Sequence, residues 1–346
     1  MKTFQVSEAD LKRVLGARAG VPMLAPTETP ATTWMDVTGE PPSREALSRA
    51  RSAQSPKGVF MPPTESVGRY GTQASAATQT RTEALVLVGM RACELRAQKY
   101  MDKVLLEGEF EDSEYRQRRE AAIIISVDCV AAAETCFCTL VGGLPYPTDG
   151  FDINLTPIEG GYLLDVATER GERWLQEIAG QLKEATEAQI AERDRSRQRM
   201  VEQLRKQNAE FGFTVGDEAP PKMPDDDSAA WQQFACDCVE CGGCTNVCPT
   251  CHCFYLYDQA LGPEQFERLR TWDSCLLSTY HRMAGGVHMK LTPRPRLLSR
   301  LANRVLHKFV YSPQQYGMLG CVGCGRCIDA CLGAIDIRRI VKELGE

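Results

Sequence analysis

Long apolar runs are missing from this chain of 346 residues. No stretch approaches the roughly 20 apolar residues that a membrane-spanning helix needs, and the N-terminus shows no secretory segment. We therefore expect a cytoplasmic protein that is soluble or attached through a partner, with no insertion into a membrane.

Recognisable catalytic and nucleotide-binding devices are missing as well. Neither a G-x-G-x-x-G fingerprint nor a G-x4-G-K-[ST] loop occurs, so Gly142-Gly143 and Gly285-Gly286 are predicted to be turns. The four histidines have no ligand spacing such as H-E-x-x-H, and no nucleophile–base pair stands out. The net charge of −6 argues against a nucleic-acid binder. We expect a chain that performs no substrate chemistry alone.

Cysteine, in contrast, is abundant, with 16 residues. Seven of them fall between Cys236 and Cys253, and four more between Cys321 and Cys331. In a chain without a secretory segment, cysteines at this density indicate metal ligands in a reducing compartment and not disulfides.

The same spacing, C-x2-C-x2-C-x3-C, occurs in both groups and is typical of a protein with two [4Fe–4S] clusters. Three cysteines of such a run bind one cubane, and the fourth binds the other. Pro249 follows the first run as the pattern expects, whereas Leu332 stands where the second run would have proline. The predicted ligands are Cys238, Cys241, Cys244 and Cys331 for cluster one, and Cys321, Cys324, Cys327 and Cys248 for cluster two.

Structural zinc in an interaction protein is the alternative of another class. A zinc site takes two C-x2-C pairs around one tetrahedral ion, which leaves the third and fourth cysteine of each run unexplained. The spacing therefore favours clusters over zinc.

The hydrophobic pattern predicts an α+β protein with an N-terminal α/β domain. The apolar segments 84–90 and 121–127 are expected to be buried strands with a helix between them, which gives a partly parallel sheet. An antiparallel continuation is expected at 151–166. The predicted divisions are residues 1–185 for this domain, 186–228 for a charged helix and an acidic, proline-rich linker, and 229–346 for a ferredoxin-like domain with a long, largely helical insertion at 254–320.

Four further cysteines follow the two predicted strands. Cys93 and Cys129 come just after them, at the carboxyl edge where open sheets place ligands, and Cys136 and Cys138 lie in the next loop. These four predict a possible third metal site, which is a [4Fe–4S] cluster or zinc. The alternative is that they are small buried hydrophobic residues.

The last four cysteines have no clear ligand pattern. Cys251, Cys253 and Cys275 are expected to pack near cluster two, with a further metal site as the alternative, and Cys236 is expected to have no ligand role.

A basic stripe recurs every four residues at Arg296, Arg300, Arg304 and Lys308. Like charges at this spacing destabilise an isolated helix, so an anionic group opposite is expected. The candidates are a partner's acidic surface and the negative charge of a cluster, and a merely solvated basic face is the alternative.

Seven further segments are specific beyond a generic ferredoxin: SPKGVFMPPTESVGRY (55–70), GMRACEL (89–95), TCFC (135–138), CGGCTNVCPTCHC (241–253), WDSC (272–275), MAGG (283–286) and GCVGCGRC (320–327). Through these segments, nearly the whole chain resembles the dicluster iron–sulfur subunits of cytoplasmic [NiFe] hydrogenases, the sulfhydrogenase beta subunits, and of anaerobic sulfite reductase. That resemblance implies an electron-transfer role between a flavin- and NAD(P)-binding partner and a catalytic partner, with hydrogenase favoured over sulfite reductase.

Overall fold

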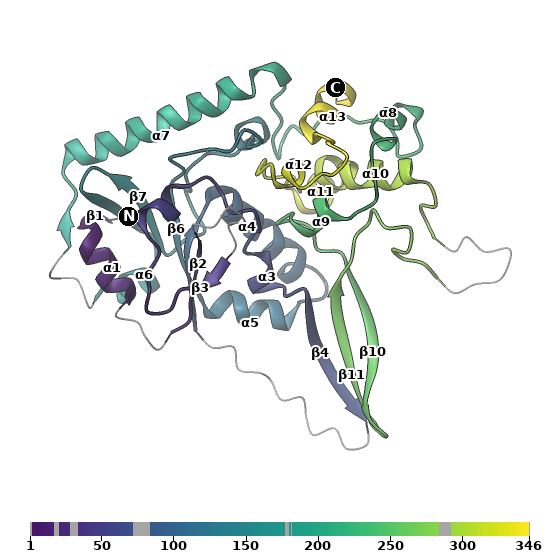
Figure 1. Cartoon of the computed structure of the whole chain (residues 1–346), viewed down its shortest axis with the longest axis horizontal. Coiled ribbons are helices and arrows are strands. Elements are labelled where there is room, and N and C mark those ends of the chain that lie inside the picture. The colour runs from purple at the N-terminus through teal and green to yellow at the C-terminus, as the bar shows by residue number, and fades with distance from the viewer. Residues whose placement is uncertain are drawn as a thin grey trace.

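A computed structural model of the chain describes residues 2–16, 21–27, 34–71, 84–176, 180, 182–283 and 292–345. Figure 1 shows a sheet with helices on its faces, a second part that carries the C-terminus, and a narrow three-stranded arm that projects away from both. The predicted turn at Gly285-Gly286 lies outside the described residues, and so does most of the 283–286 motif.

An eight-stranded sheet organises the first part, in the order β3-β2-β5-β6-β7-β8-β1-β9. Its central strands β2, β5, β6 and β7 pair in parallel, and the remaining pairs are antiparallel. The strands are β1 (Lys2–Ser7), β2 (Met23–Pro26), β3 (Trp34–Asp36), β5 (Leu85–Met90), β6 (Ala122–Val127), β7 (Ile153–Ile158), β8 (Gly161–Val166) and β9 (Lys183–Glu184).

The predicted partly parallel sheet is therefore confirmed. The two apolar segments form β5 and β6, with Val86 opposite Ile123, and the expected antiparallel continuation is the β7–β8 hairpin. Strand β1 was not predicted. Its pairing with β8 and β9 joins residues far apart in the sequence, which a local pattern does not report.

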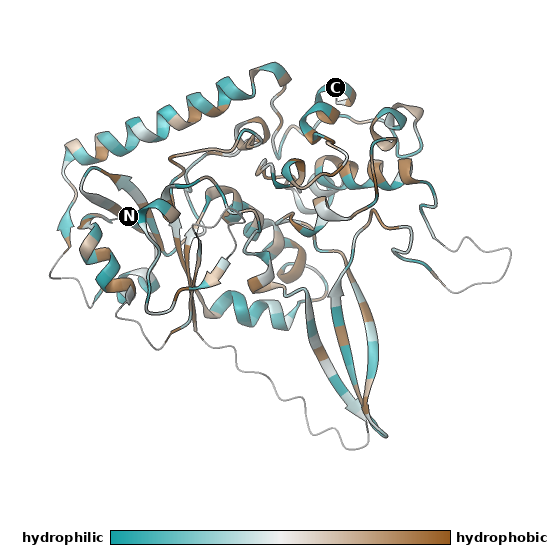
Figure 2. Ribbon diagram, viewed as in Figure 1, coloured by the Kyte–Doolittle hydropathy of each residue, from teal (hydrophilic) through white to brown (hydrophobic). Residues whose placement is uncertain are grey.

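Alternate residues of the central strands enter two separate cores, because successive side chains of a strand point to opposite faces. Val86 and Val88 pack in a core with α1 (Glu8–Gly16), α2 (Arg44–Ser48) and α6 (Glu169–Leu175). Leu87 and Met90 pack in the other core with α3 (Lys57–Phe60), α4 (Ala92–Leu106) and α5 (Ser113–Ala121). Figure 2 shows the buried strands in brown and much of α5 in teal.

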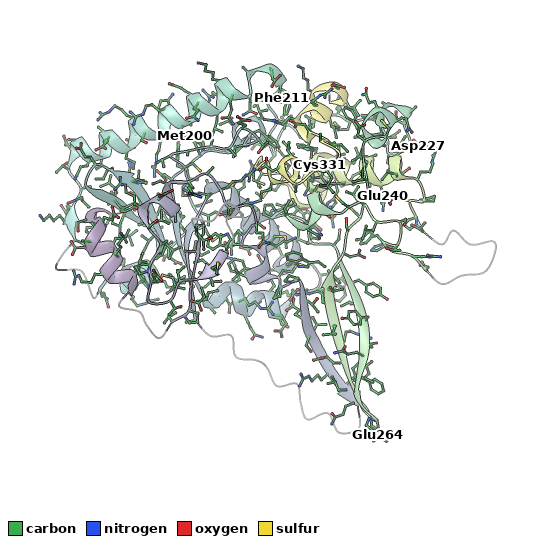
Figure 3. All side chains as sticks on the ribbon, in the orientation of Figure 1. Met200, Phe211, Asp227, Glu240, Glu264 and Cys331 are labelled. Carbon is green, nitrogen blue, oxygen red and sulfur yellow. The ribbon has the colours of Figure 1, made fainter. Side chains whose placement is uncertain are left out.

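The charged helix predicted after the sheet is α7 (Glu187–Gln207). It begins with a capping box, in which Thr186 and Gln189 bond each other's backbone N–H. The helix is not solvated all round, because Arg197 Nε donates to Asp128 Oδ2 at 2.7 Å. Met200, labelled in Figure 3, is buried where α7 reaches the loop of Cys138. Helix α7 thus connects the sheet with the cysteine-rich part.

The insertion at 254–320 is not largely helical. Its first half is a hairpin of β10 (Phe254–Gly262) and β11 (Gln265–Trp272), and β11 also pairs with β4 (Thr64–Gly71) to form the arm. Glu264 lies at the tip of the arm in Figure 3. Helical structure is described only later in the insertion, in α10 (Leu297–Leu306), the π-helix η5 (His307–Tyr311) and α11 (Ser312–Tyr316). The aromatic residues of β10 favour a strand, and the prediction overlooked them. Strand β4 comes from a distant part of the chain, so a local sequence pattern does not report its pairing with β11.

Short helices complete the second part: η1 (Cys138–Val141), η3 (Ala209–Phe211), η4 (Ala229–Trp231), α8 (Gln232–Ala235), α9 (Gly243–Asn246), α12 (Arg326–Asp329) and α13 (Ile337–Leu344). Phe137 and Phe211 pack in the same core as Trp231 and Phe309. Residues on both sides of the predicted linker therefore share one core, and the boundaries at 185 and 228 stay predictions. No helix of the described residues has the length and apolarity to cross a membrane.

The buried ion pair under α7 gives a first prediction. Replacing Arg197 with Met leaves the Asp128 carboxylate, which is 3% exposed, without its cationic partner. We expect the free energy of unfolding to fall by roughly 3 kcal/mol in denaturant titrations, because an unpaired buried charge is costly. The control is Arg195→Met, at an exposed position of the same helix. Equal stability of the two variants would contradict this account.

Candidate metal centres

The two cysteine runs fold alike. Each has a left-handed residue on either side of its second cysteine, Glu240 (φ 55°) and Gly242 (φ 69°) in the first run and Gly323 (φ 66°) and Gly325 (φ 73°) in the second. Each loop then enters a one-turn helix, α9 or α12. The left-handed positions turn the chain tightly, so the first three cysteines of a run face a common centre.

The first predicted ligand set comes together across the two runs. Cys238, Cys241, Cys244 and Cys331 line one pocket, where Leu276 and Ile337 supply apolar walls. Burial raises the pKa of Cys238, and the thiolates of Cys244, Cys331 and Cys241 raise it further. Figure 3 labels Cys331 near Glu240, the residue before Cys241.

The second predicted set also comes together, deeper in the protein. Burial raises the pKa of Cys327 to about 12, and the nearby thiolates of Cys321, Cys324 and Cys248 add to this rise. Cys248, Cys321 and Cys324 are buried, whereas Cys241 of the first set is exposed. The structure thus places the fourth cysteine of each run beside the first three of the other.

Arg304 of α10 lies between these two sets. It is 4% exposed, it lines the same pocket as Cys244 and Cys327, and its Nε and Nη2 atoms have no hydrogen-bond partner within the described parts of the chain. Burial acts to lower the pKa of Arg304, but the thiolates of Cys244, Cys327, Cys251 and Cys248 raise it well above its usual value. A buried guanidinium with unused N–H groups requires an anion at this place.

Lys308, one turn further, is also buried. Its Nζ donates to Thr250 Oγ1 at 2.9 Å and to the Gly320 carbonyl at 3.1 Å. Burial acts to lower the pKa of Lys308, but the thiolates of Cys248 and Cys251 hold it well above its usual value.

These positions decide between the interpretations of the basic stripe. Arg300, Arg304 and Lys308 are all buried, so a partner's acidic surface and a solvated face are wrong for these three. Arg300 donates to the Leu276 carbonyl at 2.8 Å and pairs with Glu240. Arg296 alone of the four is exposed. The neighbours of Arg304 and Lys308 that would be anionic are the cysteine thiolates, as expected for the charge of a cluster.

The four cysteines of the possible third site also gather at one place. Cys129 and Cys136 pack against buried Cys138, and Cys93 lines a cavity of about 310 Å³ together with Cys138. Cys93 begins α4 after β5, and Cys129 follows β6, so both lie at the carboxyl edge of the parallel strands. Burial raises the pKa of Cys129 to about 12, with a contribution from the Cys136 thiolate.

Three further cysteines, half-buried Cys251 and Cys253 and buried Cys275, take part in two cysteine pairs. Cys251 shares a hydrogen bond with Cys248, which raises the pKa of Cys251 well above its usual value. The hydrogen bond with Cys275 lowers the pKa of Cys253 to about 6. Packing of these residues near the second set stays a prediction. Exposed Cys236 donates to the Gln233 carbonyl at 3.3 Å.

Sequence reasoning missed Lys57. This buried residue donates to the Cys251 carbonyl at 3.1 Å, and its Nζ lies 3.8 Å from the ring centroid of Trp272. Both residues lie in segments that carry the family resemblance, which was the available signal. In the described part of the chain, no three His, Cys, Asp or Glu side chains form a group able to hold a single metal ion.

Comparison with known proteins defines the class. Residues 237–335 match the family model described as a 4Fe-4S dicluster domain. The chain is therefore an iron–sulfur protein with two [4Fe–4S] clusters, and the donor set fits them: eight thiols in two groups, with the unused N–H groups of Arg304 beside both.

The match also extends beyond this domain. The chain is similar to sulfhydrogenase 2 subunit beta from Pyrococcus furiosus, at 29% identity over 303 residues that cover 87% of this chain and 86% of that protein. The chain is an iron–sulfur electron-transfer protein homologous to this hydrogenase subunit, and the resemblance noted from its motifs is confirmed.

Arg304 gives a prediction about redox potential. A positive charge favours the reduced form of a nearby cluster, because reduction adds negative charge. Arg304→Met should therefore lower the midpoint potentials of both clusters, by roughly 60 mV if the reduction equilibrium changes tenfold. EPR-monitored redox titration measures this shift. Arg296→Met, at the exposed position of the same stripe, is the control and should leave both potentials unchanged. A shift in neither cluster of the Arg304 variant would show that its guanidinium does not act on them.

Proposed function

We propose that this chain is the electron-transfer component of a cytoplasmic multi-subunit oxidoreductase. It passes electrons between a flavin- and NAD(P)-binding partner and a catalytic subunit, which is that of a [NiFe] hydrogenase. The observation that carries the proposal is the pair of adjacent four-thiol groups, which share Arg304 as a neighbour. The hydrogenase assignment is supported by the similarity to a sulfhydrogenase beta subunit.

The proposed ligands follow the crosswise arrangement of the thiols. Cys238, Cys241, Cys244 and Cys331 hold one cluster, and Cys321, Cys324, Cys327 and Cys248 hold the other. When bound, the clusters supply one-electron transfer. The protein holds their thiolates in place and stabilises added negative charge through Arg304 and Lys308. It also keeps water away from the more buried group, Cys321, Cys324, Cys327 and Cys248, which we call the inner group.

The outer group, Cys238, Cys241, Cys244 and Cys331, is the proposed place where electrons are exchanged with a partner subunit. Cys241 is exposed, and two apolar residues beside this group, Val239 and Leu332, are 60% and 79% exposed. Leu332 directly follows Cys331 at the position where the run lacks its proline. Exposed apolar side chains next to a redox centre fit an interface with another subunit.

Crosswise ligation is tested by pairs of variants. If the assignment holds, Cys238→Ala and Cys331→Ala each remove the same cluster, although they lie in different runs. Each should lose about four iron atoms per chain, and both should leave the same residual EPR spectrum. Cys248→Ala should instead match Cys321→Ala, and Cys236→Ser should resemble the unchanged protein. If Cys331→Ala matched Cys321→Ala, each run would hold its own cluster.

The partner assignment is tested by anaerobic purification of the chain from its native source. The proposal expects a flavin- and NAD(P)-binding subunit to co-purify together with a [NiFe] catalytic subunit, as identified by mass spectrometry and nickel analysis. A sulfite-reducing catalytic subunit in their place would favour the dicluster subunit of anaerobic sulfite reductase. A colourless chain that contains zinc and no iron would leave the zinc-stabilised interaction protein.

The docking face is tested in the same preparation. Leu332→Glu places a charge in the proposed interface and should lower the recovery of one partner subunit about tenfold or more, because a buried unpaired charge opposes association. Phe110→Glu is the matched control, since Phe110 is 83% exposed and lies in the segment between α4 and α5. Equal recovery with both variants would move the interface elsewhere.

A further inference from the structure

Four thiols outside the dicluster domain meet at the carboxyl edge of the sheet. Three separate segments supply them: the start of α4, the end of β6, and the loop that leads into η1. Cys129 and Cys136 pack against the cluster of Cys138, Met200 and Leu204, and Cys138 shares its cavity with Cys93. We propose that these four residues hold a third [4Fe–4S] cluster, an inference that rests on the proposed electron-transfer function and extends it.

The loop of Cys136 and Cys138 packs closely, backbone against backbone, on the second cysteine run. Phe137 N–H donates to the Gly323 carbonyl at 2.8 Å. A Cβ atom at Gly323 would lie 2.5 Å from the Cys138 Cα, and one at Gly325 would lie 2.1 Å from the Thr135 carbonyl oxygen. The two glycines thus allow a backbone approach that no other residue permits. Such close packing places the third thiol group next to the inner cluster.

Cys93 reaches the same neighbourhood from the other side. It packs against Ala97, Val322 and Cys324, and the Cys136 Sγ lies 3.9 Å from the Cys324 carbonyl oxygen. Cys93 and Cys136 of the third group therefore both lie against Cys324, which is a proposed ligand of the inner cluster. This adjacency suits an electron carrier, because electrons pass readily only between neighbouring centres.

Two buried hydrogen-bond donors near the thiols have no partner among the described residues. Arg326 is fully buried and pairs with Glu94, yet its Nη1 atom has no partner. The Thr139 hydroxyl, next to Cys138, is buried and also without a partner. Buried donors are nearly always bonded in folded proteins.

A cubane satisfies these donors better than a zinc ion. Its sulfides accept hydrogen bonds, and such bonds tune cluster potentials. Zinc held by four thiolates brings no sulfide and carries no electron. The position beside Cys324, the unused donors and the cavity at Cys93 and Cys138 therefore favour a third cluster.

Metal and sulfide content tests the proposal. The anaerobically reconstituted full chain should contain about twelve iron atoms and as many acid-labile sulfides, which is three cubanes. Cys136→Ser with Cys138→Ser should lose one third of both, and Cys93→Ser, on a different element, should lose the same third. Cys236→Ser is the control and should lose none. Circular dichroism identifies any variant that fails to fold.

Several outcomes would overturn the proposal. Eight iron atoms in the unchanged chain would show that only the dicluster domain is filled, which leaves the proposed function intact. Zinc lost from the double variant in place of iron would show a structural metal at the third group. Absence of iron from every preparation would overturn this proposal together with the proposed function.

Discussion

The second part of the protein depends on one constraint, the crossing of the fourth cysteines. Cys331 has to lie beside the first run, and Cys248 beside the second, although residues 249–320 lie between the two runs. The two one-turn helices α9 and α12 must therefore pack against each other. The segment between the two runs only has to bring the second run back beside the first. In this chain it forms the hairpin of the arm and then α10.

Charge is the second constraint, and it follows from the first. Thiols gathered in two adjacent groups become strongly anionic once they bind iron, and the interior supplies cations to match. Arg304, Lys308 and Lys57 are buried at these groups, and no carboxylate pairs with them in the described residues. Buried cations without anions are strongly unfavourable. Binding of the clusters and folding of this part are therefore coupled, as in other small metal-dependent domains.

Local sequence signals predicted the features that local chemistry determines. The cysteine spacing predicted the two groups, apolar runs predicted β5 and β6, and the dense charge after residue 185 predicted the helix that is α7. Non-local pairing was not predictable in this way. Strands β1 and β4 join partners about 160 and 200 residues away, and the arm was mistaken for helix. The basic stripe showed that an anion was required, but only the burial of Arg304 and Lys308 revealed which one.

The three thiol groups differ in how far they are exposed to solvent, and this difference suggests a path for electrons with two ends. The group of Cys241 reaches the surface beside Leu332, and the group of Cys324 is buried in the middle. The group of Cys93 borders a cavity whose other walls include Arg96 and Lys99, which pair with Asp217 and Asp149 of the same cavity. A redox centre that is buried on all sides exchanges electrons only with neighbouring centres of the same protein. A centre at the surface can exchange them with a partner protein. On the proposed ligation, one partner meets the outer cluster at an apolar surface, and the other meets the third cluster at a surface that carries charges of both signs. Because the two surfaces differ in chemistry, we expect each of them to favour a different partner.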